Sequence, residues 1–320
     1  MKVLYVTKPG DVSPWYQDFV AAVGGEFEVS MWTPDRPFAS QVHDAVAVVG
    51  VGDYLEPDMI PEARQAGVRL WQLLSEGYDQ LKLDLFTANG IPLANTPGQF
   101  SARALAEHAL MLMLCTIKGF SKSQRDLKAG IFGRSFGDEL HGRTVGLIGV
   151  GASGREFARL SQPLGLPVVG IDPAGSTAEE AARLGIQVLG GPEKLGELLS
   201  RADVVSIHAP LTSATRQMMG SAAFGRMKPS AILINVSRGQ IVDQAALLDA
   251  LRSHRIAGAG LDVFAAEPLA FDDPLLAMDN VVLTPHVAGA TYETSRRRAA
   301  AAAENVQRVA RGDEPLYVVT

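Results

Sequence analysis

Short apolar runs that alternate with longer helix-like stretches constrain the fold of this chain more than any other feature. In the first hundred residues, the runs predict strands at Val3–Thr7, Val29–Trp32, Ala45–Val49, Arg69–Leu73 and Pro92–Ala94. A second series predicts strands at Thr144–Ile148, Val168–Ile171, Val204–His208, Ala231–Val236, Gly260–Val263 and Val281–Leu283. Because strands that are apolar throughout are buried on both faces, these runs indicate parallel sheets covered by helices. Two such series predict two doubly wound α/β domains.

The domain boundaries can also be predicted. A chain of 320 residues exceeds what one compact core usually holds, which favours two domains. The turn cluster Asn95-Thr96-Pro97-Gly98 ends the first series. The alanine-rich stretch 290–311 has helical composition, and we expect it to return to the first domain. The predicted domains are therefore residues 1–98 with 290–320, and residues 99–289. Within the helical stretch, Arg296-Arg297-Arg298 is expected to form a solvated face.

Composition excludes several classes of protein. The formal net charge of −6 argues against a protein that binds nucleic acid. A single cysteine, Cys115, excludes an internal disulfide and fits a reducing compartment. The apolar run 109–115 around it is too short to span a bilayer, which argues against a membrane protein. Because no secretory leader precedes the first strand, we expect a cytoplasmic protein. We predict no metal site.

A glycine-rich turn follows the first strand of the second series. Residues 149–154, Gly-Val-Gly-Ala-Ser-Gly, lie between that strand and a helix-like stretch. Gly149 permits the tight turn, Gly151 lets a pyrophosphate approach the backbone, and Gly154 lets the helix pack closely on the strand. The free N–H groups at the start of the helix then bind the negative charge. Asp172 ends the next strand, where a carboxylate accepts hydrogen bonds from the adenosine ribose and repels a 2′-phosphate. No arginine follows closely, so NAD is predicted in preference to NADP.

Four later strands end in polar groups that could form one site. Ligands of open α/β sheets bind beyond the carboxyl ends of the strands, so these groups are expected on the side of the glycine-rich turn. Arg238 can bind a carboxylate through two parallel hydrogen bonds. His286 can exchange a proton near neutral pH, and a carboxylate such as Glu267 can hold it in its useful protonation state. Each residue alone has a structural explanation, as a surface cation, a helix cap or a loop carboxylate. Three complementary groups at successive strand ends favour a catalytic site.

Eight short motifs carry a resemblance that covers nearly the whole chain. They are the segments 75–79, 95–98, 106–109, 149–154, 208–212, 235–239, 262–268 and 284–289. In this order and spacing they resemble the D-isomer-specific 2-hydroxyacid dehydrogenase family. That family includes D-3-phosphoglycerate dehydrogenases, glyoxylate and hydroxypyruvate reductases, and D-lactate dehydrogenases. The resemblance implies a flavodoxin-like substrate-binding domain and a Rossmann NAD-binding domain.

The resemblance also implies a role for each residue. Arg238 grips the substrate carboxylate and polarises its carbonyl, His286 is the general acid–base, and Glu267 bonds the histidine and favours its charged form. Asp262 lies near the nicotinamide carboxamide, while His108 is structural. The residues expected to bind substrate are Ser75, Glu76, Gly77, Arg238 and His286. The residues expected to bind the cofactor are Gly149, Gly151, Ala152, Ser153, Gly154, Asp172, His208, Ala209, Val236, Ser237, Arg238, Asp262, His286 and Ala288.

The function implied is reversible hydride transfer between NADH and a small anionic 2-oxo acid, in a homodimer formed through residues 101–141. An alternative stays open, because a fold does not fix a function: an NAD(H)-sensing interaction protein of corepressor type. The sequence departs from the family at Glu76, where members usually carry a small or neutral residue. A carboxylate there repels an anionic substrate unless it points away or meets a cation, which makes a phosphorylated substrate less attractive. Formate dehydrogenases carry glutamine in place of Glu267, which disfavours that subgroup.

Overall fold

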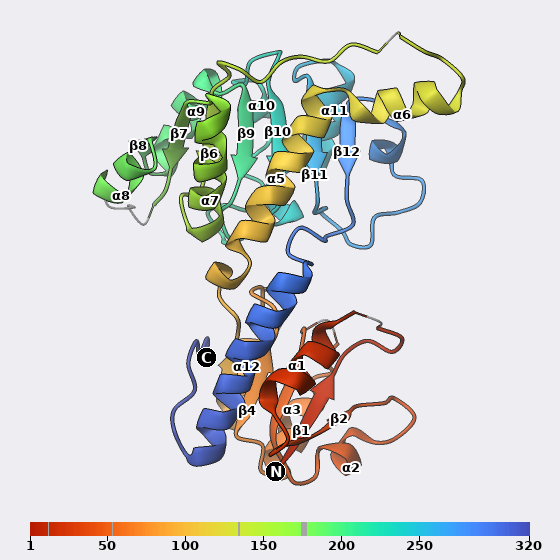
Figure 1. Ribbon diagram of the computed structural model, residues 1–320, viewed down its shortest axis with the longest axis vertical. Coiled ribbons are helices and arrows are strands. Elements are labelled where there is room, and N and C mark those ends of the chain that lie inside the picture. The colour runs from red at the N-terminus through yellow and green to blue at the C-terminus, as the bar shows by residue number, and fades with distance from the viewer. Residues whose placement is uncertain (12, 53, 134, 174–177) are drawn as a thin grey trace. The chain divides into compact units, whose positions relative to one another are not determined.

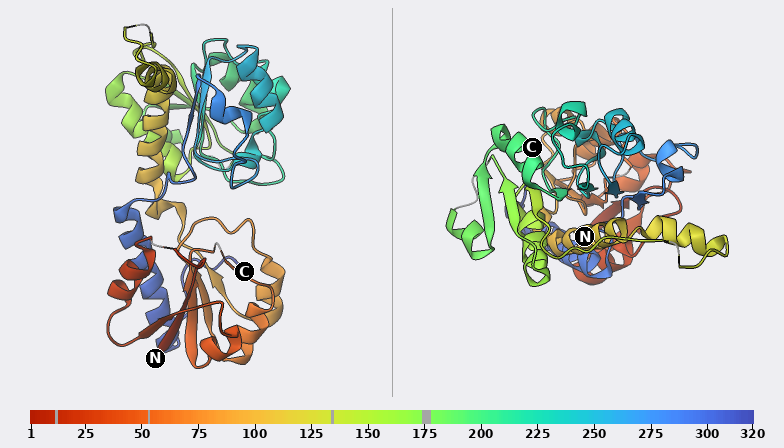
Figure 2. Two further views of the ribbon diagram at one scale, coloured as in Figure 1. Left: turned by 90° about the vertical axis from the view of Figure 1, so that its right-hand side faces the viewer. Right: turned by 90° about the horizontal axis from the view of Figure 1, so that it is seen from above.

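A computed structural model describes residues 1–11, 13–52, 54–133, 135–173 and 178–320. The chain divides into two compact units. The first unit comprises Met1–Phe100 and Ala290–Thr320, and the second comprises Ser101–Gly289. Each unit is a sheet with helices on both of its faces (Figures 1 and 2). The chain therefore enters the second unit after Phe100 and returns to the first after Gly289.

The first unit contains a five-stranded parallel sheet in the order β2-β1-β3-β4-β5 among its described residues. Its strands are β1 (Lys2–Val6), β2 (Glu28–Met31), β3 (Ala45–Gly50), β4 (Leu70–Leu73) and β5 (Leu93–Ala94). Its α-helices are α1 (Trp15–Val23), α2 (Phe38–Val42), α3 (Met59–Gln65), α4 (Leu83–Asn89) and α12 (Tyr292–Arg311). This strand order is that of flavodoxin-like folds, which confirms the predicted class of this domain.

Helix α12 completes the core of the first unit on one face of the sheet. Its residues Ala299, Ala302 and Val306 are buried against strand residues such as Val3 and Val49. The prediction of a solvated arginine face is wrong at Arg298. That side chain is 9% exposed and its guanidinium carbon lies 5.7 Å from the centre of the Trp15 ring on α1. Arg296 and Arg297 are exposed. Helix α12 packs alongside α1, and this packing places the Arg298 guanidinium against the aromatic face of Trp15.

The second unit contains a seven-stranded parallel sheet in the order β12-β11-β10-β9-β6-β7-β8 among its described residues. The strands are β6 (Val145–Ile148), β7 (Val168–Ile171), β8 (Ile186–Gly190), β9 (Val204–Ile207), β10 (Ile232–Asn235), β11 (Gly258–Leu261) and β12 (Val281–Leu283). The α-helices are α5 (Ala102–Ile117), α6 (Phe120–Lys128), α7 (Ala152–Ser161), α8 (Ala178–Arg183), α9 (Leu195–Arg201), α10 (Ser221–Phe224) and α11 (Gln244–Arg252). The order reverses between β6 and β9, as in Rossmann folds, which confirms the predicted class. Strand β8 was not predicted.

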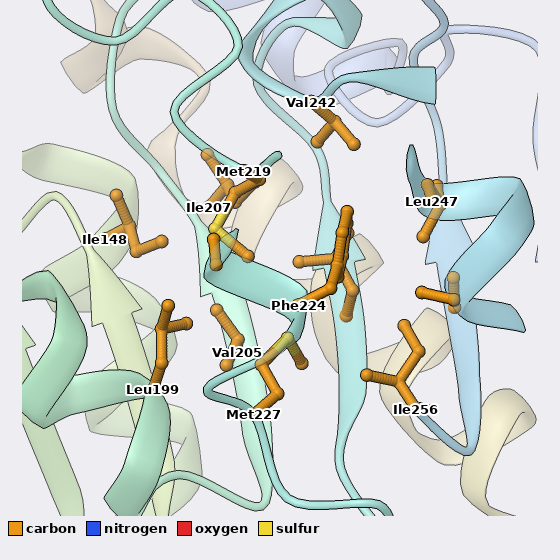
Figure 3. Close-up of a cluster of buried hydrophobic side chains, with 14 of the residues drawn as sticks. Ile148, Leu199, Val205, Ile207, Met219, Phe224, Met227, Val242, Leu247 and Ile256 are labelled. Atoms are coloured by element: carbon orange, nitrogen blue, oxygen red, sulfur yellow. The ribbon is translucent and has the colours of Figure 1, made fainter. Parts of the chain in front are cut away.

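Buried side chains cover both faces of the second sheet. On one face, residues such as Val205 and Ile207 pack against Phe224 of α10 and Leu247 of α11 (Figure 3). On the other, residues including Ile234 pack against α5 and α7. Because side chains fill both faces of the sheet, a ligand can bind only at the edge where the parallel strands end.

Helix α5 carries Cys115, whose side chain is half-buried. Burial raises the pKa of its thiol, which favours the unreactive protonated form. Across the described ranges, no single helix is both long and apolar enough to cross a membrane; only the bent pair α5 and α6, taken together, meets that requirement.

Candidate active site

The glycine-rich turn begins where β6 ends, and two of its glycines are required by close contacts. Gly149 has a φ of +96°, and a β-carbon there would lie 2.8 Å from the backbone nitrogen of Ala209. At Gly154, on the first turn of α7, a β-carbon would lie 2.3 Å from the carbonyl oxygen of Gly149. A β-carbon at Gly151 would meet no atom within 4 Å in the described part of the chain. The turn is therefore closely packed at Gly149 and Gly154 and open at Gly151, so a pyrophosphate can approach its backbone N–H groups.

Asp172 follows β7 and is held against this turn. Its Oδ2 accepts a hydrogen bond of 2.7 Å from the backbone N–H of Val150. The bond fixes a carboxylate beside the turn, where it can accept from the hydroxyls of an adenosine ribose. Residues 174–177, which come soon after Asp172, lie outside the described residues. The donors of the turn and this acceptor fit the chemistry of NAD.

His208 ends β9 and is buried, with 9% of its surface exposed. Its Nε2 lies 2.9 Å from Ser206 Oγ and its Nδ1 lies 3.1 Å from Ser153 Oγ. Burial lowers the pKa of His208 to about 3, so the ring is neutral. Because the protein occupies both ring nitrogens, His208 acts on the glycine-rich turn through Ser153. The neighbouring Ala209 is linked to the loop that follows β10, because Ser237 Oγ donates a hydrogen bond to its carbonyl oxygen.

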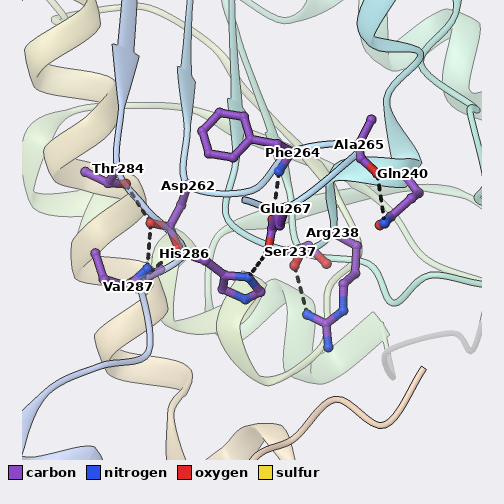
Figure 4. A network of polar contacts seen from close by, with 11 residues as sticks. Ser237, Arg238, Gln240, Asp262, Phe264, Ala265, Glu267, Thr284, His286 and Val287 are labelled. Atoms are coloured by element: carbon purple, nitrogen blue, oxygen red, sulfur yellow. Dashed lines mark hydrogen bonds and ion pairs between the residues drawn. The ribbon is translucent and has the colours of Figure 1, made fainter. Parts of the chain in front are cut away.

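His286 and Glu267 form an imidazole–carboxylate pair at the ends of β12 and β11. The Nδ1 of His286 lies 2.7 Å from Glu267 Oε2, and Glu267 Oε1 accepts a second bond of 2.9 Å from the N–H of Phe264 (Figure 4). A carboxylate can only accept, so the proton of a neutral imidazole lies on Nδ1. The Nε2 atom is then the position at which His286 can exchange a proton with a ligand. The His286 side chain is 51% exposed.

Electrostatics favour the charged form of both members of this pair. The hydrogen bond to Glu267 raises the pKa of His286 above its ordinary value, against the opposing effects of burial and of the positive Arg238. Burial alone would raise the pKa of Glu267, but hydrogen bonds from His286 and Phe264 bring it below its ordinary value. An imidazolium next to an ionised carboxylate is a proton donor poised for reduction.

Arg238 follows β10, and its guanidinium is close enough to His286 to act on its charge. Its Nη1 donates a hydrogen bond of 2.9 Å to the carbonyl oxygen of Ser237 (Figure 4). The next residue, Gly239, explains how the Arg238 and Glu267 loops come together. A β-carbon at Gly239 would lie 1.9 Å from the carbonyl carbon of Phe264. Only glycine lets these two loops approach so closely.

Replacing Gly239 with alanine is therefore expected to destabilise the protein by about 1–3 kcal/mol, the usual cost of overpacking a buried site. Turnover should fall too, because the Phe264 loop has to move and carries Glu267 with it. The measurement is the midpoint of thermal unfolding. Gly151→Ala is the matched control, since its added methyl group meets open space and should leave that midpoint unchanged. Equal midpoints for the two variants would contradict the close approach.

Asp262 holds the backbone around His286. Its side chain is fully buried, and it accepts bonds of 2.9 Å and 2.8 Å from the N–H groups of Val287 and Ala288. Thr284 Oγ1 donates to it at 2.6 Å, and His108 Nε2 lies 2.8 Å from that Thr284 oxygen. Burial would raise the pKa of Asp262, but His108, whose Nε2 lies 3.4 Å from Asp262 Oδ1, and the bonds from Thr284 and the two N–H groups bring it below its ordinary value, so the carboxylate is ionised.

These hydrogen bonds hold the backbone at His286 in an unusual conformation. His286 has a φ of +56°, which residues other than glycine rarely adopt. Sequence reasoning did not find this function of Asp262. The signal was present only as a carboxylate at a strand end whose partners come about 25 residues later. The predicted contact of Asp262 with the nicotinamide carboxamide stays a prediction.

The remaining predicted residues lie in two places. Val236 and Ala288 are buried in the second unit, at 4% and 3% exposure. The predicted substrate loop, Ser75 to Gly77, follows β4 and belongs to the first unit. There Ser75 Oγ donates to the carbonyl oxygen of Gly77 at 3.1 Å, and Asn95 Nδ2 donates to that of Glu76 at 2.7 Å. The Glu76 carboxylate lies against Gly98, where a β-carbon would stand 2.6 Å from Oε1. The glycine-rich turn, Arg238, Glu267 and His286 all belong to the second unit.

Comparisons with known proteins agree with this arrangement. Residues 110–288 match the family model described as D-isomer specific 2-hydroxyacid dehydrogenase, NAD binding domain. The chain is 35% identical over 305 residues to a glyoxylate reductase of Korarchaeum cryptofilum, with 92% of this chain and 90% of that protein covered. It is 33% identical over 298 residues to a D-3-phosphoglycerate dehydrogenase of Methanocaldococcus jannaschii, of which it covers 55%.

A solved structure agrees too. The NAD-complexed D-isomer specific 2-hydroxyacid dehydrogenase of Lactobacillus delbrueckii ssp. bulgaricus superposes with a TM-score of 0.81 at 25% identity, with 100% of both chains covered. The predicted NAD cofactor is thereby confirmed. By its family model, its relatives and its fold, the chain belongs to the D-isomer specific 2-hydroxyacid dehydrogenase family and is an NAD-dependent oxidoreductase of 2-hydroxy acids.

Proposed function

We propose that this protein catalyses reversible hydride transfer between NADH and a small 2-oxo acid, with the 2-hydroxy acid in the D configuration. One observation carries the proposal: the His286–Glu267 pair, joined at 2.7 Å, and Arg238 follow three neighbouring strands, β12, β11 and β10, at one edge of the sheet. An acid–base group and a carboxylate-binding cation are what the reduction of a 2-oxo acid requires of a protein. The D configuration rests on membership of the family.

Arg238 binds the substrate carboxylate in this proposal. A guanidinium presents two parallel N–H groups to a carboxylate, which fixes the orientation of the acid as well as its position. With the carboxylate held, the neighbouring carbonyl oxygen is directed toward His286.

His286 moves the proton. Nicotinamide supplies the hydride in the reducing direction. As negative charge develops on the carbonyl oxygen, Nε2–H of the imidazolium donates its proton there, and Glu267 stabilises the charged ring through Nδ1. In the oxidising direction, the lone pair on Nε2 of the neutral ring accepts the hydroxyl proton. The raised pKa of His286 favours reduction at neutral pH.

The pH dependence of reduction should report this pair. Because reduction needs the imidazolium, kcat should fall as the pH rises through the raised pKa of His286. Glu267→Gln removes the negative charge but keeps a side chain of similar shape. The pKa of His286 should then fall, and the decline in kcat should move to lower pH. The measurement is the pH profile of NADH oxidation at saturating 2-oxo acid.

The oxidising direction provides the control for that experiment. Oxidation needs neutral His286, so its rate rises with pH through the same pKa, and in Glu267→Gln this rise should also move to lower pH. A common displacement in both directions identifies one group. If the two profiles stay where they are in the wild type, Glu267 does not set the protonation of His286.

A substrate screen tests the proposed activity directly. NADH oxidation is measured with glyoxylate, hydroxypyruvate, pyruvate, 3-phosphohydroxypyruvate and longer 2-oxo acids, and the product is tested for its configuration. Turnover of at least one acid to a D product is expected. Absence of turnover on all of them would overturn the proposal and favour the alternative, a nucleotide-sensing interaction protein. That alternative is not favoured by the comparisons, because the relatives reported above are named as enzymes. The same screen tests whether the Glu76 carboxylate disfavours 3-phosphohydroxypyruvate by repulsion between like charges.

We also propose a homodimer formed through residues 101–141. Large apolar side chains in this stretch are exposed, among them Phe120, Leu127, Phe132 and Phe136, and a monomer rarely leaves so many together in water. Sedimentation velocity measures the mass, and a monomer at micromolar concentration would contradict the assembly. A cytoplasmic location stays a prediction.

A further inference from the structure

Three buried or half-buried side chains connect β9 with the glycine-rich turn, and the proposed mechanism does not use them. His208 lies between Ser206 on β9 and Ser153 on α7, at 2.9 Å and 3.1 Å from their hydroxyl oxygens. Its ring also packs on Phe157 of α7, with 5.4 Å between ring centroids. Ser206 is fully buried, whereas Ser153 is half-buried. Ser206, His208 and Ser153 therefore form a row of hydrogen-bonded side chains that leads from the protein interior to the surface at the glycine-rich turn.

The direction of the hydrogen bonds in this row follows from the burial of Ser206. His208 is neutral, so one ring nitrogen donates and the other accepts. Among the described residues, His208 is the hydrogen-bond partner of Ser206 Oγ and no second one is found. If Nε2 carried the proton, Ser206 would accept it and its own hydroxyl proton would be buried without an acceptor, which is costly. Ser206 therefore donates to Nε2, and the ring proton lies on Nδ1.

This direction determines what Ser153 can do. The Nδ1–H of His208 donates to Ser153 Oγ, so the hydroxyl proton of Ser153 is directed away from the ring. Ser153 is the second residue of α7, between Gly151, which faces open space, and Gly154. A hydroxyl proton at that position adds a side-chain donor to the backbone N–H groups at the start of the helix.

We propose that Ser153 donates its hydroxyl proton to the cofactor pyrophosphate, and that His208, held by Ser206, is the positioning residue that keeps this proton turned outward. The inference rests on the proposed placement of the pyrophosphate at the glycine-rich turn. The ligand class it specifies is a nucleotide diphosphate. A molecule that shares the adenosine but lacks the phosphates gains nothing from Ser153.

Ligand affinities without turnover test the role of Ser153. NADH is titrated by fluorescence in the absence of substrate, and ADP-ribose and adenosine are measured by competition. In Ser153→Ala, the affinities for NADH and ADP-ribose should fall roughly ten- to hundredfold, as expected for a lost bond to a charged acceptor. The affinity for adenosine should be unchanged. Unchanged ADP-ribose affinity, or an equal loss for adenosine, would overturn the proposal.

A second variant separates this inference from the placement on which it rests. Gly151→Val puts a branched side chain into the open space of the turn and should abolish ADP-ribose binding while adenosine still binds. If ADP-ribose binds that variant normally, the pyrophosphate does not lie at the turn and the placement fails. If Gly151→Val blocks ADP-ribose but Ser153→Ala does not weaken it, the inference alone fails.

The positioning role of His208 is tested by its tautomer and by coupling. In protein labelled with ¹⁵N-histidine, the nitrogen shifts of His208 should report a proton on Nδ1 that does not titrate between about pH 5 and pH 9. Ser206→Ala should weaken ADP-ribose binding in the wild-type background but leave it unchanged in the Ser153→Ala background. A proton on Nε2, or equal effects of Ser206→Ala in both backgrounds, would contradict the role, and thermal unfolding verifies that each variant is folded.

Discussion

Replacing His286 with glutamine is expected to lower kcat for reduction by about 10²–10⁴-fold, the usual contribution of a positioned general acid. Glutamine preserves much of the size of the side chain and can still bond Glu267, but it has no proton to transfer at neutral pH. The glycine-rich turn follows β6, which lies four strands away from β12 in the sheet order. NADH affinity should therefore stay near that of the wild type, which fluorescence titration measures alongside steady-state turnover.

A second histidine offers a matched control for this variant. His43 also bonds a neighbouring carboxylate, with its Nδ1 2.8 Å from Asp44 Oδ2, but it lies on the exposed surface of the first unit. His43→Gln should leave kcat unaffected. Near-normal turnover by His286→Gln would remove that residue from the mechanism.

Replacing Arg238 with alanine should raise KM strongly and lower kcat, so that kcat/KM falls by about a hundredfold or more. Two hydrogen bonds to a charged carboxylate are lost, at about 1.5–3 kcal/mol each, and the carbonyl is no longer aligned. The loss should be similar for every 2-oxo acid that the screen identifies, since all share the carboxylate. Steady-state kinetics with two such acids measure it.

Arg238→Lys distinguishes charge from geometry. Lysine retains the positive charge but cannot present the planar pair of donors, so activity should lie between those of the wild type and Arg238→Ala. A defect confined to NADH affinity in either variant would contradict a role in substrate binding.

Much of the fold was predictable because buried parallel strands are apolar throughout. Val168–Ile171 and Val281–Leu283 have the predicted bounds. Strand β11 lies two residues earlier than predicted, at Gly258–Leu261, because the apolar Val263 and Phe264 resemble strand residues. They lie instead in the loop that delivers Glu267. The edge strand β8 was missed, since Gln187 interrupts its apolar run.

The candidate residues were predictable as chemical types, but their supporting contacts were not. Arg238, Glu267 and His286 stand out at strand ends as a cation, an acid and an imidazole. Nothing local in the sequence indicates that Asp262 holds the backbone of His286, because the partners meet only when β11 and β12 lie side by side. Arg298 likewise depends on Trp15, which the chain supplies almost 300 residues earlier.

The place of α12 in the first unit has a consequence for synthesis of the chain on the ribosome. The sheet of that unit is made from the first hundred residues, but one of its faces is covered by Ala299, Ala302, Val306 and their neighbours. Helix α1 covers part of that face early, but the part that α12 covers stays open while the whole of the second unit is being translated. The nascent first unit therefore exposes apolar strands for more than half the time of synthesis, when chaperones that bind such surfaces have access to it.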